Sequence, residues 1–123
     1  MADKARVLVI DDEPAIRRIV RQALEPTHEV LEASDGPEGF ARVTTERPDL
    51  ILLDLVMPTM HGLAVLAKLK AHESTSGIPV IIVSVKGDTE ALIEGQREGA
   101  LDYVIKPFDV GELRRVVQRN LIR

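Results

Sequence analysis

The sequence between positions 50 and 54 reads Leu50-Ile51-Leu52-Leu53-Asp54, four apolar residues followed directly by an acid. A short, uninterrupted apolar run is typical of a strand that is buried on both faces of a parallel sheet. Two further runs have the same length and character, Val7–Ile10 and Val80–Val83. These three runs therefore predict the central strands of a sheet whose two faces are both covered.

Two other strand candidates are less apolar, which suits the edges of the same sheet. The segment Glu29–Ala33 contains two glutamates, so we expect one of its faces to meet water. The segment Tyr103–Ile105 is only three residues long. We therefore expect both segments to form edge strands.

Helical patterns fill the gaps between these strands. Pro14 suits the first turn of a helix, and Asp109 with Glu112 forms an N-cap pair for the last one. Apolar stripes for these two helices consist of Ile16, Ile19, Val20, Ala23 and Leu24, and of Val110, Leu113, Val117 and Leu121. Further helices are expected from Gly36 to before Pro48, around Leu63–Leu69, and over Asp88–Glu98. Strand and helix thus alternate five times, which predicts an α/β fold with a doubly wound parallel sheet.

The composition predicts a single globular domain over residues 1–123. The mass is 13.6 kDa, and 45% of the residues are apolar. Cysteine is absent, which excludes a disulfide scaffold, a thiolate metal site and a cysteine nucleophile. A net charge of −4, with one tyrosine and two phenylalanines, argues against direct binding of nucleic acid. The apolar runs are too short to cross a membrane and no signal peptide is recognised, so we expect a cytoplasmic protein.

Polar side chains follow the strands at the points where they end. Asp11 and Asp12 follow the first strand, and Asp54 follows the third. Ser84 follows the fourth strand, and Lys106 follows the fifth. Ligands of an open parallel sheet bind beyond the carboxyl ends of its strands. If the first and third strands are neighbours, three carboxylates converge there.

Three converging carboxylates repel one another, so each of them resists ionisation. A divalent cation removes this conflict, and oxygen ligands of this kind favour Mg²⁺. Lys106 adds a positive charge and Ser84 adds a hydroxyl donor, which together suit a bound phosphoryl group. A carboxylate can also accept a phosphoryl group and form an aspartyl phosphate. Each residue alone is a weak signal, but the joint pattern indicates phosphoryl chemistry.

With these motifs, the sequence resembles the receiver domain of two-component response regulators, including the single-domain chemotaxis regulators. The resemblance extends over essentially the whole chain. Its signatures are Val7–Glu13, Leu50–Pro58 with Met60 and Gly62, and Gly99-Ala100 followed by Asp102–Phe108. It implies a flavodoxin-like, five-stranded parallel sheet with the strand order 2-1-3-4-5.

The resemblance also implies a role for each residue at the strand ends. Asp54 is the expected phosphoacceptor and one of the Mg²⁺ ligands. Asp12 is the expected chief Mg²⁺ ligand, and Asp11 is expected to hold a metal-bound water. The backbone carbonyl of Val56 is expected to complete the protein ligands. Lys106 is expected to bind a phosphoryl oxygen, and its peptide bond to Pro107 is expected to be cis.

A phosphorylation-controlled switch follows from the same resemblance. The Ser84 hydroxyl is expected to turn toward the phosphoryl group, and Tyr103 to rotate between outward and inward positions. This change is expected to act on a surface made by the fourth helix, the fifth strand and the fifth helix, and this surface is expected to control a downstream protein or an attached output domain.

The expected phosphodonor is a histidine kinase or a phosphotransfer protein. The domain is expected to catalyse its own phosphorylation and slow dephosphorylation, and not to be an enzyme with a diffusible product. A weak homodimer through the fourth and fifth helices is left open.

Two positions, Val85 and His61, depart from the family pattern, and Val56 occupies a position beside the site that varies in the family. Val85 stands where a small residue is usual, so it is expected to narrow access to the phosphoryl group. His61 stands where an acid is common, and we expect it to lie in a surface loop. Val56 is apolar and cannot orient an attacking water molecule by hydrogen bonding, which predicts a long-lived phosphoryl group.

Other functions remain as alternatives at this point. One is a receiver-fold protein-interaction module that does not use its phosphoacceptor, which only Val85 favours. Another is a phosphatase of the haloacid dehalogenase type, which needs a second acid where Val56 stands. A flavin-binding protein is disfavoured, because Asp11, Asp12 and Glu13 would repel a phosphate.

Overall fold

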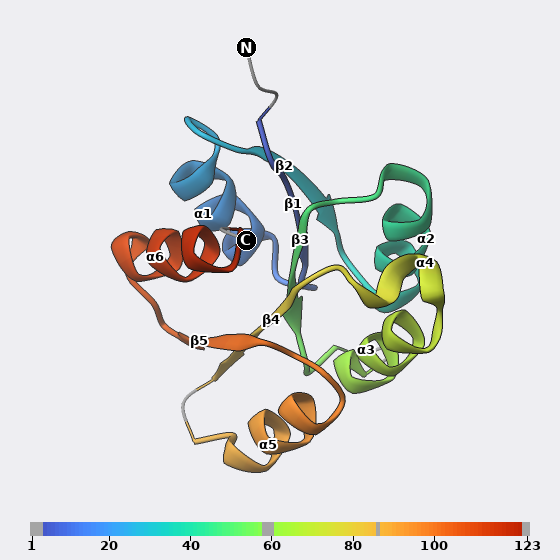
Figure 1. Ribbon diagram of the computed structural model, residues 1–123. Coiled ribbons are helices and arrows are strands. Elements are labelled where there is room, and N and C mark those ends of the chain that lie inside the picture. The colour runs from blue at the N-terminus through green and yellow to red at the C-terminus, as the bar shows by residue number, and fades with distance from the viewer. Residues whose placement is uncertain (1–3, 58–60, 86, 122–123) are drawn as a thin grey trace.

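A five-stranded parallel sheet runs through the centre of the molecule (Figure 1). The computed structural model describes residues 4–57, 61–85 and 87–121. In chain order the strands are β1 (Arg6–Ile10), β2 (Glu29–Ala33), β3 (Leu50–Asp54), β4 (Val80–Val85) and β5 (Asp102–Lys106). Their order across the sheet is β2-β1-β3-β4-β5, which confirms the expected topology.

Helices cover both faces of this sheet. They are α1 (Pro14–Leu24), α2 (Gly36–Glu46), α3 (Gly62–Ala71), α4 (Glu73–Ser76), α5 (Thr89–Arg97) and α6 (Val110–Leu121). The helices α1 and α6 pack on one face, and α2, α3 and α5 pack on the other (Figure 1). Alternate side chains of each strand therefore enter two separate cores. Within the described residues, no helix combines the length and the apolar character needed to cross a membrane.

The three central strands are buried as their sequence predicts. Every residue of β3 is buried, and so are the apolar runs of β1 and β4. The edge strands β2 and β5 are partly exposed. Each fully buried leucine or isoleucine contributes roughly 1.5–3 kcal/mol by the hydrophobic effect. The central runs therefore hold the sheet together, and their ends have little freedom to move.

The two expected helix stripes are narrower than the sequence suggests. Ile19 of α1 and Val110 of α6 are exposed rather than buried. Val116 joins the core of α6 beside Leu113 and Val117. Both exposed residues lie at the margin of the apolar face, where the periodic pattern alone does not separate core from rim.

The single helical turn α4 is absent from the sequence-based expectation. The buried hydroxyl of Thr75 donates to the carbonyl of Leu69 at 2.6 Å. The Lys70 ammonium donates to the carbonyls of Ser76 at 3.0 Å and Ile78 at 3.1 Å. Hydrogen bonds from side chains to backbone carbonyls thus stabilise this turn. Such contacts produce no periodic pattern of apolar residues in the sequence.

Gly62 lies where the start of α3 approaches the end of β3. Its N–H donates to the carbonyl of Leu55 at 2.9 Å. A β-carbon at this position would overlap the Asp54 carbonyl oxygen and lie 2.5 Å from the Leu55 Cα. Because these are backbone atoms, no rotamer change can relieve the overlap. The glycine therefore allows α3 to begin directly against the strand end that carries Asp54.

We expect Gly62→Ala to lower the free energy of unfolding by about 2 kcal/mol, because the overlap forces the backbone to shift. Gly77→Ala is the matched control, since a β-carbon there meets no atom within 4 Å. Urea unfolding followed by circular dichroism compares the two variants with the wild type. Equal stabilities of the two variants would contradict the close packing of α3 on β3.

Candidate functional site

The carboxyl ends of four neighbouring strands, β1, β3, β4 and β5, bring the expected polar residues to one edge of the sheet. Asp11 directly follows β1, Asp54 is the last residue of β3, and Lys106 is the last residue of β5. Ser84 lies on β4 between them, and the next residue, Val85, pairs with Lys106. The parallel register therefore gathers side chains that are far apart in the sequence.

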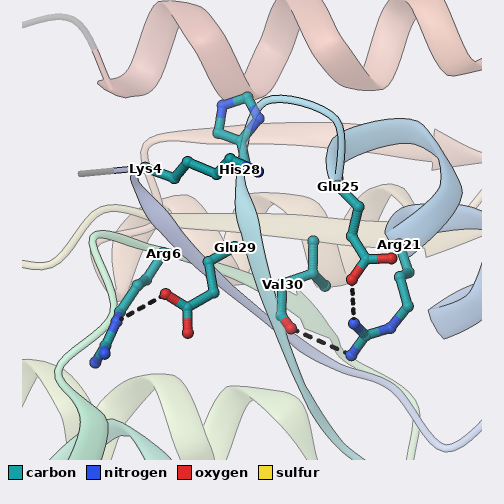
Figure 2. Close-up of a pocket in the computed structure, with 7 residues that line it drawn as sticks. All are labelled: Lys4, Arg6, Arg21, Glu25, His28, Glu29 and Val30. Carbon is teal, nitrogen blue, oxygen red and sulfur yellow. Dashed lines mark hydrogen bonds and ion pairs between the residues drawn. The ribbon is translucent and has the colours of Figure 1, made fainter. Parts of the chain in front are cut away.

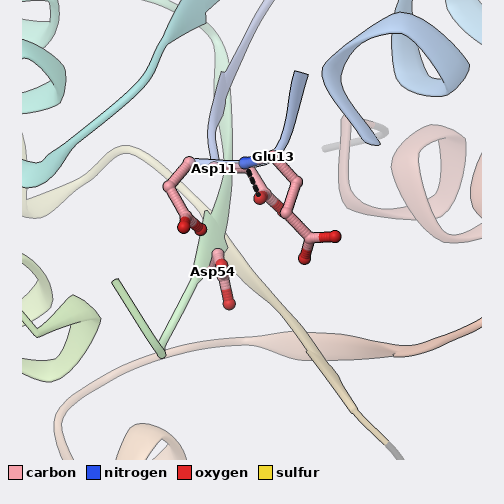
Figure 3. A group of neighbouring side chains, drawn as sticks. Asp11, Glu13 and Asp54 are labelled. Carbon is pink, nitrogen blue, oxygen red and sulfur yellow. Dashed lines mark hydrogen bonds between the residues drawn. The ribbon is translucent and has the colours of Figure 1, made fainter. Parts of the chain in front are cut away.

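Four carboxylates form a compact group at this edge, which we call the acidic group: Asp11, Asp12, Glu13 and Asp54. Each contributes one oxygen, and these four oxygens lie within 4.8 Å of one another. Figure 3 shows Asp11 and Glu13 beyond β1, and Asp54 at the end of the neighbouring strand β3. Asp11 is 1% exposed and Asp54 is 6% exposed, which is unusual for acids.

Asp11 is fixed from several sides. Its N–H donates to the carbonyl of Ala33 in β2 at 3.1 Å. Its Oδ1 accepts a hydrogen bond from the Glu13 N–H at 2.9 Å (Figure 3). Its Oδ2 forms an ion pair with the Lys106 Nζ at 2.8 Å. The Asp11 carboxylate is therefore held in place inside the acidic group.

Lys106 supplies the positive charge that faces these acids. Besides Asp11, its Nζ lies 3.2 Å from Glu13 Oε1 and 3.7 Å from Asp54 Oδ2. Burial by itself lowers the pKa of Lys106, but the neighbouring carboxylates, Asp11 foremost, outweigh this effect and raise the pKa. Lys106 is therefore a cation at neutral pH.

The Asp54 carboxyl has a strongly raised pKa. Burial is the main cause, and repulsion from Asp11 adds to it, so that the pKa rises to about 7. The Lys106 ammonium and a 3.2 Å hydrogen bond from the Val56 N–H to Oδ1 act in the opposite direction. One ammonium therefore does not fully compensate the charge of the acidic group.

The donor set of the acidic group fits a hard divalent cation. Its ligand atoms are carboxylate oxygens, which Mg²⁺ prefers in proteins. Asp12 and Glu13 reach solvent, so a cation that keeps part of its water shell can be accommodated. Additional positive charge would also relieve the repulsion that raises the pKa of Asp54.

Ser84 adds a buried hydroxyl on the neighbouring strand. It is 2% exposed, and its Oγ has no hydrogen-bond partner among the residues that the structure describes. A buried polar group without a partner costs free energy, which is recovered when a ligand atom supplies the bond. The hydroxyl is thus available to an oxygen-rich ligand.

Other residues singled out in the sequence surround this edge. Tyr103 on β5 is 45% exposed, and the side chains of Val56 and Val85 are exposed as well. The peptide bond between Lys106 and Pro107 is cis. His61 is exposed at the start of α3, where its Nδ1 accepts a hydrogen bond from the Leu63 N–H at 3.2 Å, so it caps this helix. Two residues of the central signature, Pro58 and Met60, lie outside the described residues.

A cavity of about 830 Å³ lies at the opposite end of β1 and β2 (Figure 2). Both arginines that line it already pair with groups of the same chain. Arg6 pairs with Glu29 at 3.2 Å. Arg21 pairs with Glu25 at 2.5 Å and donates to the Val30 carbonyl at 3.2 Å. The evidence for a functional site is therefore weaker at this cavity than at the acidic group.

A family model for the response regulator receiver domain matches residues 7–118. The chain belongs to the response regulator receiver domain family. The acidic group, together with Lys106, is the phosphorylation pocket of this two-component receiver domain, and such an acidic cluster is typical of the Mg²⁺ site of receivers.

Curated relatives of this receiver domain differ in length. Protein PilH of Pseudomonas aeruginosa is 39% identical over 118 residues, which are 95% of this chain and 98% of PilH. The DNA-binding dual master transcriptional regulator RpaA of Synechocystis is 41% identical over 119 residues. The match covers 96% of this chain but only 49% of RpaA, so the receiver spans about half of that relative.

Solved structures resemble the receiver domain over nearly its whole length. The chemotaxis protein CheY4 of Vibrio cholerae has a TM-score of 0.89 and 30% identity, and the match covers 95% of this chain and 98% of CheY4. The receiver domain of NtrX from Brucella abortus has a TM-score of 0.87 and 33% identity, and the match covers 94% of this chain and 97% of the NtrX domain. These similarities confirm the receiver fold.

Sequence reasoning did not assign a role to two residues that contact the site. Glu13 lies in the same acidic run as Asp11 and Asp12, and its place in the acidic group and its contact with Lys106 distinguish it from an ordinary solvated acid. Arg17 donates to the Asp11 carbonyl at 2.7 Å. No residue pattern predicts this contact, because its acceptor is a backbone group.

In metal-free protein, we expect the Asp54 carboxyl to titrate at about pH 7. Lys106→Met should raise this pKa further, because it removes a positive charge, and Asp11→Asn should lower it. Carbon-13 NMR of the aspartate carboxyls measures these values, and Asp54→Asn assigns the signal.

Titration of Asp54 also affects stability. The folded chain keeps a proton that the unfolded chain releases near about pH 4. The free energy of unfolding should therefore fall as the pH rises from about 4 to about 7. An Asp54 signal that titrates near about pH 4 in the folded protein would contradict the burial of this carboxyl.

Proposed function

We propose that residues 1–123 form one phosphoacceptor receiver domain, and that Asp54 accepts a phosphoryl group from a histidine kinase or a phosphotransfer protein. The observation that carries this proposal is the buried Asp54 carboxyl, with a pKa of about 7, 3.7 Å from the Lys106 ammonium and inside the acidic group. A carboxylate so placed can act as a nucleophile only where positive charge keeps it ionised and also neutralises the incoming phosphoryl group.

The transfer step exchanges one bond for another. An Oδ atom of ionised Asp54 attacks the phosphorus, and the bond between phosphorus and the donor's histidine nitrogen breaks. The electron pair of that bond stays with the departing imidazole, and the product is an acyl phosphate on Asp54. No group other than the phosphoryl moves between the two proteins.

Each residue of the pocket has a distinct task in this step. Asp11, Asp12, Asp54 and the Val56 carbonyl would hold Mg²⁺, which supplies charge compensation at the carboxylate and at the phosphoryl oxygens when it is bound. Lys106 binds a phosphoryl oxygen with its ammonium, which is already within ion-pair distance of Asp54.

Ser84 and Tyr103 connect the pocket to the surface. The unpartnered Ser84 hydroxyl donates to a phosphoryl oxygen, and the space that it vacates allows Tyr103 to turn inward. Tyr103 lies on β5 between α5 and α6, where Ile93 and Leu101 are also exposed. The phosphoryl group thereby biases an apolar surface formed by α5, β5 and α6.

This surface passes the signal to a downstream protein, to an attached output domain, or to a second copy of the chain in a weak homodimer. The receiver makes no direct contact with nucleic acid or membrane in this scheme. It catalyses its own phosphorylation and slow dephosphorylation, and it does not release a diffusible product as an enzyme does.

Asp54→Asn should abolish phosphorylation by acetyl phosphate or by a cognate kinase, because an amide oxygen is a poor nucleophile and forms no stable acyl phosphate. Intact-mass spectrometry at equal Mg²⁺ measures the phosphorylated fraction, and Asp35→Asn at the N-cap of α2, outside the acidic group, serves as the control. Equal labelling of Asp54→Asn and wild type would refute Asp54 as the acceptor. A wild type that takes no label and binds no Mg²⁺ would instead favour a protein-interaction module.

The phosphoryl group on Asp54 should persist for minutes or longer, because the exposed Val56 side chain offers no hydrogen bond to an attacking water molecule. Val56→Asn should shorten its lifetime several-fold by supplying that hydrogen bond. Leu101→Asn is the control for added polarity at an exposed position before the start of β5, away from the strand end that carries Lys106. Loss of the phosphoryl group from the wild type within seconds would contradict this prediction.

A further inference from the structure

Arg17 of α1 connects the acidic group to the edge strand β2. Its Nη1 donates to the backbone carbonyl of Asp11 at 2.7 Å. Its Nε donates to the Glu32 carboxylate of β2 at 2.9 Å. We propose that Arg17 is a positioning residue that sets the affinity of the acidic group for Mg²⁺, an inference that rests on the proposed function.

The reach of Arg17 follows from helix geometry. Side chains of an α-helix lean toward its N-terminus, and therefore lie over the turn that precedes their own Cα. Arg17 is the fourth residue of α1, so its guanidinium lies over the segment that joins β1 to this helix. The planar guanidinium has donors on different sides, which allows it to bridge two acceptors at once.

The accepting carbonyl belongs to the peptide unit that joins Asp11 to Asp12. Its orientation therefore helps to decide where both side chains project. Asp11 has further attachments through its N–H and its carboxylate. For the Asp12 carboxylate, the described residues provide no hydrogen bond or ion pair, so the backbone is what directs it. Loss of the Arg17 contact should consequently misplace Asp12.

Glu32 compensates the positive charge of Arg17, so this guanidinium does not neutralise the carboxylates of the acidic group. Burial by itself would raise the pKa of Glu32, but hydrogen bonds from Arg21 and Arg17 outweigh it and lower the pKa. Glu32 is thus an anion that compensates the charge of Arg17. The guanidinium acts on the acidic group through its hydrogen bond rather than as a substitute cation.

Arg21 provides a matched control one turn further along α1. It donates to the same Glu32 at 2.8 Å, and its other contacts are with Glu25 and the Val30 carbonyl. Among the described residues it has no hydrogen bond to the acidic group. A merely structural role for the Glu32 contacts would therefore affect Arg17 and Arg21 variants alike.

The experiment compares wild type with Arg17→Met, Arg17→Lys and Arg21→Met. Metal-free protein is titrated with Mg²⁺ by isothermal calorimetry, and the Asp12 amide signal is followed by NMR. Arg17→Met should weaken Mg²⁺ binding about tenfold, as loss of a residue that orients a metal ligand commonly does. Arg17→Lys keeps one of the two contacts, so its Mg²⁺ affinity should lie between those of the wild type and Arg17→Met. Arg21→Met should bind Mg²⁺ as the wild type does.

Phosphorylation by acetyl phosphate adds a readout that separates affinity from chemistry. Arg17→Met should need more Mg²⁺ for half-maximal rate, yet approach the wild-type rate at saturation, because Asp54 and Lys106 are intact. Urea unfolding without Mg²⁺ should show similar losses for Arg17→Met and Arg21→Met, since each loses a contact with Glu32.

Equal Mg²⁺ affinities for Arg17→Met and Arg21→Met would overturn the inference while leaving the proposed function intact. If Arg17→Met does not fold, wild-type affinity in Arg17→Lys has the same consequence. A wild type that neither binds Mg²⁺ nor takes a phosphoryl group would refute the proposed function itself, and the inference with it.

Discussion

Carboxylates at the ends of two neighbouring strands repel one another, and a single lysine from the far edge strand holds them together. The Lys106 ammonium lies within 3.7 Å of three of them, and its own pKa is raised by their presence. The balance remains incomplete, as the pKa of about 7 for Asp54 shows. A bound cation or phosphoryl group would change the same electrostatic sum as the Lys106 ammonium does.

The fold serves this balance by fixing the strand ends. The acids lie at the ends of buried apolar strands, whose packing prevents the backbone of the acids from moving apart. Gly62 lets α3 begin against the carbonyl of Asp54, and Arg17 ties the Asp11 carbonyl to β2. Repulsion within the pocket is therefore opposed by packing and hydrogen bonds that lie outside it. The stability of the sheet and the chemistry of its edge are linked in this way.

Much of this arrangement was predictable from sequence, and the reasons are physical. Uninterrupted apolar runs such as Leu50–Leu53 have one efficient burial mode, in the middle of a parallel sheet, and the acid that follows must then lie at the sheet edge. The turn α4, the Arg17 contact and the helix cap by His61 were not predicted. Each depends on a side chain meeting a backbone group, and any polar residue can make such a contact without a recurring pattern.

The ion pair between Lys106 and Glu13 joins residues 93 positions apart. A ribosome makes the acids that follow β1 and end β3 before it makes this lysine, and domains generally fold as units during synthesis. A nascent chain that ends before β5 therefore carries the mutually repelling acids without their ammonium. The neutralising ammonium arrives only with the fifth strand, which is also an edge of the sheet, so the charge balance of the pocket is incomplete until most of the domain has been synthesised.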